Sequence, residues 1–430
     1  MPKTKYTLRY YLLLVLLLVA LFFSNDFGLV DIQKTAIVLA AGIDRDGAEF
    51  VVSTQIAVPQ ESDQGENVQA VLIESRGDTI AKAFDQINAK TGWYPKLAFC
   101  NLIILGSSAT EKNVFECLDF FLRNEYMSDG CNLVAAEGKA KDLLNATTPI
   151  EKISSLAAEK VLSRQASSTG SAAVNTLRAF SIGYYGASKS GYLPILTTQS
   201  PEDSPENIEN KQENPSQKES GSSSGGSGQS QKSGESGSDQ SGGGGQGGGE
   251  NGKNGGGGSE EKHVFEAGET ALFFDGVMVG KLNRKQTFAL CAAKTKLDLS
   301  SYPLEHDGAA YSLQIKNSAP KLKFFIDKNA RVSLKIDVRL TAGIRDVSFS
   351  QKVPELLTGG ALPEQLFPTA QKKLEEEILS VFETGRQCNC DVFGVLDRLQ
   401  KFEPNYFNAF KDDLLDRIHP KISVSFSPLR

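Results

Sequence analysis

The sequence predicts a mixed α/β (α+β) fold in two halves, and three observations support it. Strand-like runs alternate with runs of helical period along most of the 430 residues. Two aspartate-glycine pairs, at Asp46 and Gly47 and at Asp275 and Gly276, are typical of hairpin turns. A glycine- and serine-rich stretch cannot bury a core. We therefore predict a signal anchor over 1–30, an N-terminal α/β domain over 31–197, a disordered linker over 198–262 and a C-terminal α/β domain over 263–430.

The N-terminus has the pattern of an export signal. Lys3, Lys5 and Arg9 precede an apolar run over 10–23, which is somewhat shorter than the roughly 17–25 residues of a spanning helix but has apolar neighbours on both sides. Cleavage needs small residues before the cut, whereas "VALFFSND" is bulky there. We expect an uncleaved signal anchor whose basic end stays in the cytoplasm.

The N-terminal half alternates strands and helices. The segment "KTAIVLAAGIDRDGAEFVVSTQIAVP" predicts two strands around the first turn. In "GDTIAKAFDQINAKTG" we expect a helix capped by Asp78, with Ile80, Phe84 and Ile87 on one face and Gly92 as its stop. A buried strand in "KLAFCNLIILG", a helix in "NVFECLDFFLRNEY" and a strand followed by a short helix in "CNLVAAEGKAKDLL" complete this half.

Carboxylates gather at the first turn and allow a second interpretation. Asp44, Asp46 and Glu49 resemble part of a calcium-binding loop. The spacing lacks the third acidic position and the distant bidentate glutamate of such loops. A solvated hairpin turn is therefore the favoured interpretation.

The C-terminal half begins with a second hairpin in "ETALFFDGVMVGKL". Two long alternating runs follow, and they place Phe324, Val332, Leu334, Ile336 and Val338 on the inner face of an antiparallel sheet. The segment "QKKLEEEILSVFETG" predicts a helix with Leu374, Ile378 and Phe382 as its apolar stripe, Gly385 as its stop and a solvated face at residues 375–377. The final strand is "KISVSFS".

Charge and cysteine usage exclude several classes of function. A net charge of -6 without a general basic character argues against nucleic acid as a partner. The six cysteines are too scattered for a disulfide scaffold. Cys388 and Cys390 form the one close pair, but a tetrahedral zinc site would need ligands that His263, His306 and His419 do not obviously supply. We predict no metal and no cofactor.

Catalysis has no clear signature either. Outside the glycine- and serine-rich stretch, neither a Gly-x-Ser-x-Gly elbow nor a His-Glu-x-x-His motif occurs. Ser318 with Lys321 and the Lys-Thr-Gly at residues 90–92 match two parts of the penicillin-binding pattern, but in reversed order and with Ser318 expected in a loop. The prediction is that the protein is not an enzyme and has no catalytic or cofactor-binding residues, with an exported hydrolase acting through Ser318 as a distant alternative.

Two isolated residues have both a ligand-binding and a packing interpretation. Trp93 in "TGWYPK" has the ring to stack on a small ligand, but a packed turn aromatic is commoner. Arg123 can clamp a carboxylate, although a surface or interdomain ion pair is the usual outcome. Neither residue predicts a site by itself.

The order of motifs resembles the Ger(x)C family of spore germination proteins, the C subunits of nutrient germinant receptors. The residues that carry it are "AIVLAAGID", "VVSTQIAVP", "ESRGDTIAKAF", "KLAFCNLIILG", "DFFLRNEY", "EGKAKDLL" and "GYLPIL" before the glycine-rich stretch, and "ETALFFDGVMVGKL" and "CDVFGVLDRL" after it. The resemblance implies a non-enzymatic protein of several α/β domains on the outer face of the spore inner membrane. Its implied partners are a multi-span receptor subunit and a subunit that has both spans and a soluble domain.

Three features depart from the family pattern. Asp26 and Phe27 stand where the family has its acylated cysteine and a tryptophan, so a lipid cannot be attached at that point. Cys100 and Asn101 replace a frequent Gly-His pair. The linker is also unusually long and rich in glycine, and the end after "ISVSFS" is short.

These observations predict a membrane-anchored, extracytoplasmic subunit of a germinant receptor complex that acts through protein-protein interaction. A small-molecule nutrient would act through the complex. The alternative is a cell-envelope binding or assembly module of the same fold outside sporulation.

Overall fold

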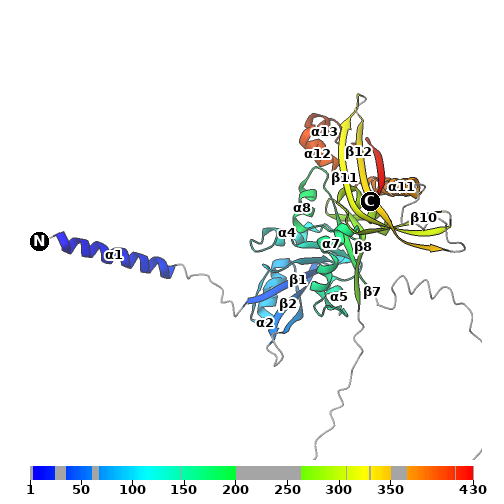
Figure 1. The fold of residues 1–430 in the computed structure, drawn as a ribbon. Coiled ribbons are helices and arrows are strands. Elements are labelled where there is room, and N and C mark those ends of the chain that lie inside the picture. Colours follow the sequence, from blue (N-terminus) through cyan, green and yellow to red (C-terminus); the bar gives the residue numbers. More distant parts are fainter. Residues whose placement is uncertain are drawn as a thin grey trace, which may run out of the picture.

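The computed structural model describes residues 3–24, 35–60, 67–146, 148–199, 263–306, 308–328, 331–349, 366–411 and 413–429. These residues form two β-sheets with helices packed on them, which confirms the mixed α/β fold (Figure 1). The predicted linker lies outside the described residues, apart from its first two positions, which belong to a strand. The end of the predicted anchor, including Asp26 and Phe27, also lies outside them.

The N-terminal apolar run is a single helix, α1 (Lys3–Ser24). Its side chains from Tyr10 to Val19 are exposed. Among the helices that the structure describes, none reaches the combination of length and apolarity needed to cross a membrane.

The first sheet has nine strands in the order β3-β2-β1-β5-β6-β7-β8-β9, with β4 beside β1. Strands β1, β5, β6 and β7 are mutually parallel, whereas the β1-β2-β3 and β7-β8-β9 ends are antiparallel. Because β8 and β9 follow the glycine-rich stretch, the sheet contains chain from both halves. The strands are β1 (Thr35–Asp46), β2 (Glu49–Gln60), β3 (Asn67–Gly77), β4 (Tyr94–Lys96), β5 (Leu102–Leu105), β6 (Asn132–Ala136), β7 (Ser190–Gln199), β8 (Val264–Phe274) and β9 (Val277–Leu282).

Helices cover both faces of the first sheet. On one face, Ile87, Leu118 and Phe180 pack into a core under α2, α4 and α8. On the other, Leu144 and Ala158 pack under α5 and α6. Burial on both sides explains why β5 is apolar along its whole length. The helices are α2 (Ile80–Thr91), α3 (Ser107–Thr110), α4 (Phe115–Arg123), α5 (Ala140–Asn145), α6 (Ser154–Val161), α7 (Arg164–Thr169) and α8 (Leu177–Tyr185).

The second sheet has four strands in the order β10-β11-β12-β13, namely β10 (Ser300–His306), β11 (Ala309–Ile326), β12 (Val332–Phe349) and β13 (Ile418–Pro428). The predicted antiparallel arrangement holds for β10, β11 and β12. The final strand, β13, for which the sequence predicted no pairing, runs parallel to β12. The helices between these two strands supply the crossover that a parallel pair requires. They are α11 (Leu366–Gln387), α12 (Val395–Phe402) and α13 (Pro404–Phe410).

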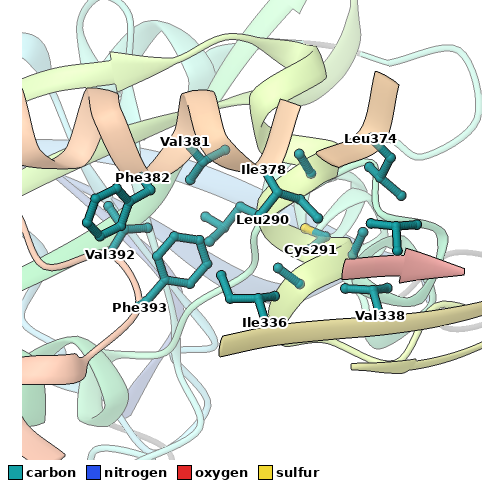
Figure 2. Packing of buried hydrophobic residues seen from close by; sticks show 14 of the residues in the cluster. Leu290, Cys291, Ile336, Val338, Leu374, Ile378, Val381, Phe382, Val392 and Phe393 are labelled. Atoms are coloured by element: carbon teal, nitrogen blue, oxygen red, sulfur yellow. The ribbon is translucent and has the colours of Figure 1, made fainter. Parts of the chain in front are cut away.

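Helix α10 (Arg284–Lys294) joins the two sheets. It contacts β8 and β9 of the first sheet, β11 and β12 of the second, and α11. Its buried alanines, Ala289, Ala292 and Ala293, let these elements approach closely. Figure 2 shows Leu290 and Cys291 of α10 between the α11 stripe and the strand residues Ile336 and Val338. One core therefore includes both sheets.

The apolar stripe predicted for α11 is confirmed, its predicted stop is wrong, and the predicted solvated face at residues 375–377 holds only for Glu376, which is exposed. Leu374, Ile378 and Phe382 are buried, while Gly385 lies inside the helix, where a Cβ would come within 2.7 Å of Val392. The glycine is needed for close packing and does not terminate the helix. Two glutamates next to the stripe bond inward: Glu375 accepts from the Val424 amide at 2.8 Å and Glu377 from the Tyr302 hydroxyl at 3.1 Å.

Local predictions for the first half need small corrections. Thr79, one residue after Asp78, caps α2 by accepting from the Lys82 amide. Gly47 follows the last residue of β1 and has a φ of 62°, so the turn lies one residue later than predicted. The strand predicted in "KLAFCNLIILG" is limited to β5, because the chain before it forms a turn closed by the Cys100 amide on the Leu97 carbonyl at 3.0 Å.

The outer face of the second sheet carries an unfavourable row of charges. Lys323 on β11 lies directly opposite Lys335 on β12, and Lys335 lies directly opposite Lys421 on β13. Like charges directly opposite each other destabilise a sheet. We expect Lys323→Gln to raise the free energy of unfolding by about 0.2–1 kcal/mol at low salt. The gain in stability should vanish in concentrated salt, because the Debye length then falls to about 3 Å and the repulsion between the lysines is screened.

Urea unfolding at two salt concentrations measures this effect. Lys372→Gln on α11 is the matched control, because its side chain is 80% exposed and lies on another surface. A loss of stability in Lys323→Gln at low salt would contradict the prediction.

Candidate functional site at the junction of the two sheets

The strongest candidate for a functional site is a polar junction between the two halves. It joins the loop over 186–190, the segment over 388–397 and the β8-β9 turn. The first and second of these contain or adjoin the sequences "GYLPIL" and "CDVFGVLDRL". The junction therefore connects stretches that are about 200 residues apart in the chain.

Asp397 on α12 holds the loop between α8 and β7. Its Oδ1 accepts from the Ser188 amide at 2.9 Å and its Oδ2 from the Ser188 hydroxyl at 2.9 Å. A Cβ at Gly186 would lie 2.6 Å from Oδ1 of Asp397, so a side chain there would displace the carboxylate. Hydrogen bonds to an ionised acceptor are stronger than neutral ones. This contact is a strong polar link between the two halves.

Asp391 provides a second link. Its amide donates to the Ser190 hydroxyl at 2.9 Å, and its carboxylate accepts from the Leu396 amide at 2.6 Å in the first turn of α12. Burial raises the pKa of the Asp391 carboxyl above its ordinary value of 3.8, while the amides of α12 oppose that shift. The Asp391 carboxylate thus fixes the start of α12, and the Asp391 backbone amide fixes the start of β7.

The β8-β9 turn completes the junction. Asp275 and Gly276 both adopt positive φ, 48° and 80°, as predicted for this hairpin. The Asp275 amide donates to the Lys189 carbonyl at 2.9 Å, and the Lys189 ammonium pairs with the Asp275 carboxylate at 3.1 Å. The Val114 amide, which precedes α4, donates to the Gly276 carbonyl at 2.9 Å. The turn therefore ties α4, β7 and β9 together.

The chemistry of the junction favours a mechanical role. Burial raises the pKa of the Cys390 thiol to about 12, which leaves it protonated and weakly nucleophilic at neutral pH. Within the described residues, no group of three or more His, Cys, Asp or Glu side chains is placed to hold a metal ion. The polar groups bond to backbone and to one another. Such a network fixes a geometry and can transmit a shift of one half to the other.

Asp44 makes a comparable link inside the first half. It ends the sequence "AIVLAAGID", and its carboxylate accepts from the Ala140 amide at 3.1 Å and the Lys141 amide at 3.4 Å at the start of α5. Asp46 instead pairs with Arg76 at 2.7 Å. Two of the three carboxylates considered for a calcium loop, Asp44 and Asp46, therefore bind different partners.

The Asp44 link makes a prediction about pH. Burial raises the pKa of Asp44 above its ordinary value of 3.8, so the folded chain binds this proton more tightly than the unfolded chain. Its contribution is complete below the ordinary pKa and declines as pH rises through the folded-state pKa. We expect the free energy of unfolding of the native chain, minus that of Asp44→Asn, to fall as pH rises above about 4.

Urea unfolding over a pH series tests this expectation. Asp78→Asn is the control, because that carboxylate is 68% exposed and pairs with Lys82 at the surface. If the native and Asp44→Asn curves stay parallel, the buried carboxyl does not titrate as the geometry requires.

The structure separates the residues considered for metal binding. Cys388 lies under Gly280, whose added Cβ would be 2.5 Å from its Sγ, whereas Cys390 faces the Gly191 carbonyl at 3.6 Å. His263 precedes β8, His306 contacts Thr369 at 3.1 Å and His419 lies on the outer face of the second sheet. The three histidines therefore lie in three separate places.

The penicillin-binding pattern is not assembled. Ser318 lies within β11 and not in a loop, it is 1% exposed, and its hydroxyl accepts from the Leu297 amide at 2.6 Å. Lys321 is exposed on the opposite face of that strand. Lys90 lies in the last turn of α2 and donates to the Glu74 carbonyl at 2.9 Å. Ser318 is thus too buried to act as a nucleophile with Lys321.

The two isolated residues follow their packing interpretations. Trp93 is half-buried against the core under α2. Arg123 pairs with Asp119 at 2.6 Å on the surface of α4. Neither contributes to the junction.

The sequence did not identify Ser188, Asp391 and Asp397 as residues of a candidate site. An aspartate shortly before an apolar helical run is a usable capping signal for Asp391. No local signal identifies the loop at Ser188 as the partner, because the contact spans 209 positions.

Models of protein families match both halves of the chain. Residues 29–198 match the model described as "Spore germination protein N-terminal domain", and residues 268–428 match the one described as "Spore germination B3/ GerAC like, C-terminal". No curated protein matches the chain. The crystal structure of the GerBC protein is similar with 15% sequence identity and a TM-score of 0.47, over 91% of this chain and 97% of that one. The two family models cover most of the sequence, and the chain belongs to the Ger(x)C family of spore germination proteins.

Proposed function

We propose that the protein is an extracytoplasmic C subunit of a nutrient germinant receptor complex at the spore inner membrane. The match of both family models, on either side of the glycine-rich stretch, carries this proposal. The subunit would act by protein-protein interaction, without catalysis of its own. Its partners would be a multi-span subunit and a subunit with both membrane spans and a soluble domain.

The junction supplies the mechanical part of the proposal. A nutrient signal received elsewhere in the complex would shift one half of this subunit. Because Asp397, Ser188 and Lys189 connect α12, β7 and the β8-β9 turn through direct bonds, the other half would have to follow. Signal transfer by a rigid link needs no buried nucleophile, metal or cofactor.

Co-purification tests the proposal. A tagged chain extracted from spore membranes in mild detergent should bring a multi-span partner with it, and its deletion should slow nutrient-triggered germination while germination by non-nutrient agents stays normal. A protein that stays alone in detergent, and whose deletion leaves nutrient germination unchanged, would contradict it. Production in growing cells and not in the forespore would favour an envelope module outside sporulation.

We further propose that α1 is retained as an uncleaved signal anchor in place of a lipid. The basic residues before its apolar run and the bulky "LFFSND" sequence at the end of that run support retention. Intact-mass measurement of the native protein tests this directly. A mature chain starting near Asp26, or one carrying an acyl group, would refute it.

A further inference from the structure

The outer face of the second sheet carries a cluster of cations that the junction does not use. We call this surface the basic face and define it by Lys321, Lys323, Lys335, Arg339 and Lys421. The register places Lys323, Lys335 and Lys421 side by side across three strands. Lys321 and Arg339 lie on the same face, because side chains alternate along each strand.

The charge of the basic face is unbalanced. In the described stretches 319–325, 333–341 and 419–427, the one outward carboxylate is Asp337, which pairs with Lys335 at 3.1 Å. The whole chain has a net charge of -6, so this face is a positive surface on an acidic protein. Packing does not explain it, since adjacent like charges cost stability.

The helices leave this face open. Helix α10 contributes Leu290, α11 contributes Leu374 and α12 contributes Leu399 to the core on the opposite face, where Leu334 and Ile336 are buried. Figure 1 shows the β11-β12 hairpin extending beyond the rest of the sheet. The basic face is therefore accessible along the hairpin.

An aromatic side chain stands at the hairpin end of the same face. Phe325 follows Lys323 by two positions, so both point outward, and Phe325 is 54% exposed. It lies opposite Ser333, which is paired with His419. An exposed ring beside a row of lysines gives an apolar contact at the edge of a cationic surface.

We propose that the basic face lies against the anionic headgroups of a phospholipid bilayer, with Phe325 inserted at the headgroup boundary. The centre of a protein interface is usually depleted of lysine and rich in aromatic residues. Here the centre is lysine and serine, and the aromatic residue is at the edge. Cationic residues near an anionic leaflet and an aromatic contact at the boundary are the two elements of interfacial membrane binding.

A local fluorescence experiment tests the proposal with the full chain. The single tryptophan of the sequence is replaced by Trp93→Phe, and Phe325→Trp then makes position 325 the reporter. The protein is mixed with vesicles of phosphatidylcholine, alone or with phosphatidylglycerol, that contain brominated lipid. We expect strong quenching at position 325 with anionic vesicles, and weak quenching with neutral vesicles or at high salt.

Two triple variants separate this surface from general electrostatics. Replacing Lys323, Lys335 and Lys421 with Gln should lower the equilibrium constant for binding of the basic face to anionic lipid by about 100-fold. Each cation near the membrane surface contributes on the order of fivefold to that constant. Lys82, Lys160 and Lys372 lie on other surfaces. Replacing these three with Gln makes the same change in net charge and should leave the quenching intact. Circular dichroism checks that both variants fold.

The outcomes are distinguishable from those of the proposed anchor. Sedimentation with neutral vesicles reports attachment through α1, whereas quenching at position 325 reports the basic face. Absent quenching with anionic vesicles, or equal quenching in the Lys323, Lys335 and Lys421 variant, would overturn the proposal. So would cross-linking of Lys335 in native membranes to an acidic protein and not to lipid.

Discussion

Gly183→Ala is expected to lower the free energy of unfolding by about 2–3 kcal/mol. In an ordinary helix interior the same substitution raises the free energy of unfolding, by at most ~1 kcal/mol. Gly183 lies in α8, and a Cβ there would lie 2.2 Å from the Ser190 carbonyl oxygen and 3.4 Å from its carbon. The obstacle is backbone, so no rotamer change relieves it. Helix α8 would have to move away from β7.

The displacement should damage both the core and the junction. Phe180, one turn earlier on α8, packs on Phe273 of β8 with ring centroids 5.2 Å apart. Ser190 bonds the amide of Asp391, so a shift of its backbone also reaches α12. Urea unfolding measures the loss.

Gly138→Ala is the matched control. Gly138 has no atom within 4 Å of an added Cβ and no positive φ, so the change should alter the free energy of unfolding by less than about 0.5 kcal/mol. If Gly183→Ala were neutral or stabilising, the close contact between α8 and β7 would not exist in solution.

Elements with strong periodicity were predictable, because local patterns determine them. The helix at α2 ends at Gly92, which has a φ of 71°, and the Asp275 and Gly276 turn has two positive φ values, both as expected from the sequence. The alternation in β11 and β12 placed Val332, Leu334, Ile336 and Val338 in the core correctly. In each case the residues that determine the local structure are close to it in the sequence.

Elements fixed by distant contacts were not predictable. Gly385 reads as a helix stop, but its role comes from Val392, which packs against it. The parallel pairing of β13 depends on a crossover, not on the strand's own pattern. The continuation of the first sheet through β8 depends on pairing with β7 across the glycine-rich stretch.

The same distinction explains what was missed at the junction. Family motifs marked "GYLPIL" and "CDVFGVLDRL" as significant, but each motif is incomplete alone. Ser188 becomes a donor and Asp397 an acceptor only when the two halves dock. A site made by docking has no signature within either segment.

Asp397→Ala should therefore lower the free energy of unfolding by about 2–3 kcal/mol. The substitution removes the charged acceptor of two hydrogen bonds and leaves the two buried donors of Ser188 without that acceptor. Asp413→Ala is the control, because that carboxylate is 73% exposed and its contact with Arg417, at 3.9 Å, is long. We expect the control to change stability by less than about 0.5 kcal/mol. Equal effects of the two substitutions would mean that α12 does not depend on the loop.

A double-mutant cycle shows whether this loss reflects the contact itself. Gly186→Ala alone forces a Cβ to within 2.6 Å of the Asp397 carboxylate and 3.0 Å of the Ile182 carbonyl oxygen. Without the carboxylate, the first clash disappears and the second remains. The cost of Gly186→Ala should therefore be smaller, by about 1 kcal/mol, in the Asp397→Ala background. Additive costs would show that α12 and the α8-β7 loop are not in contact, and the junction would then have no means of coupling the two halves.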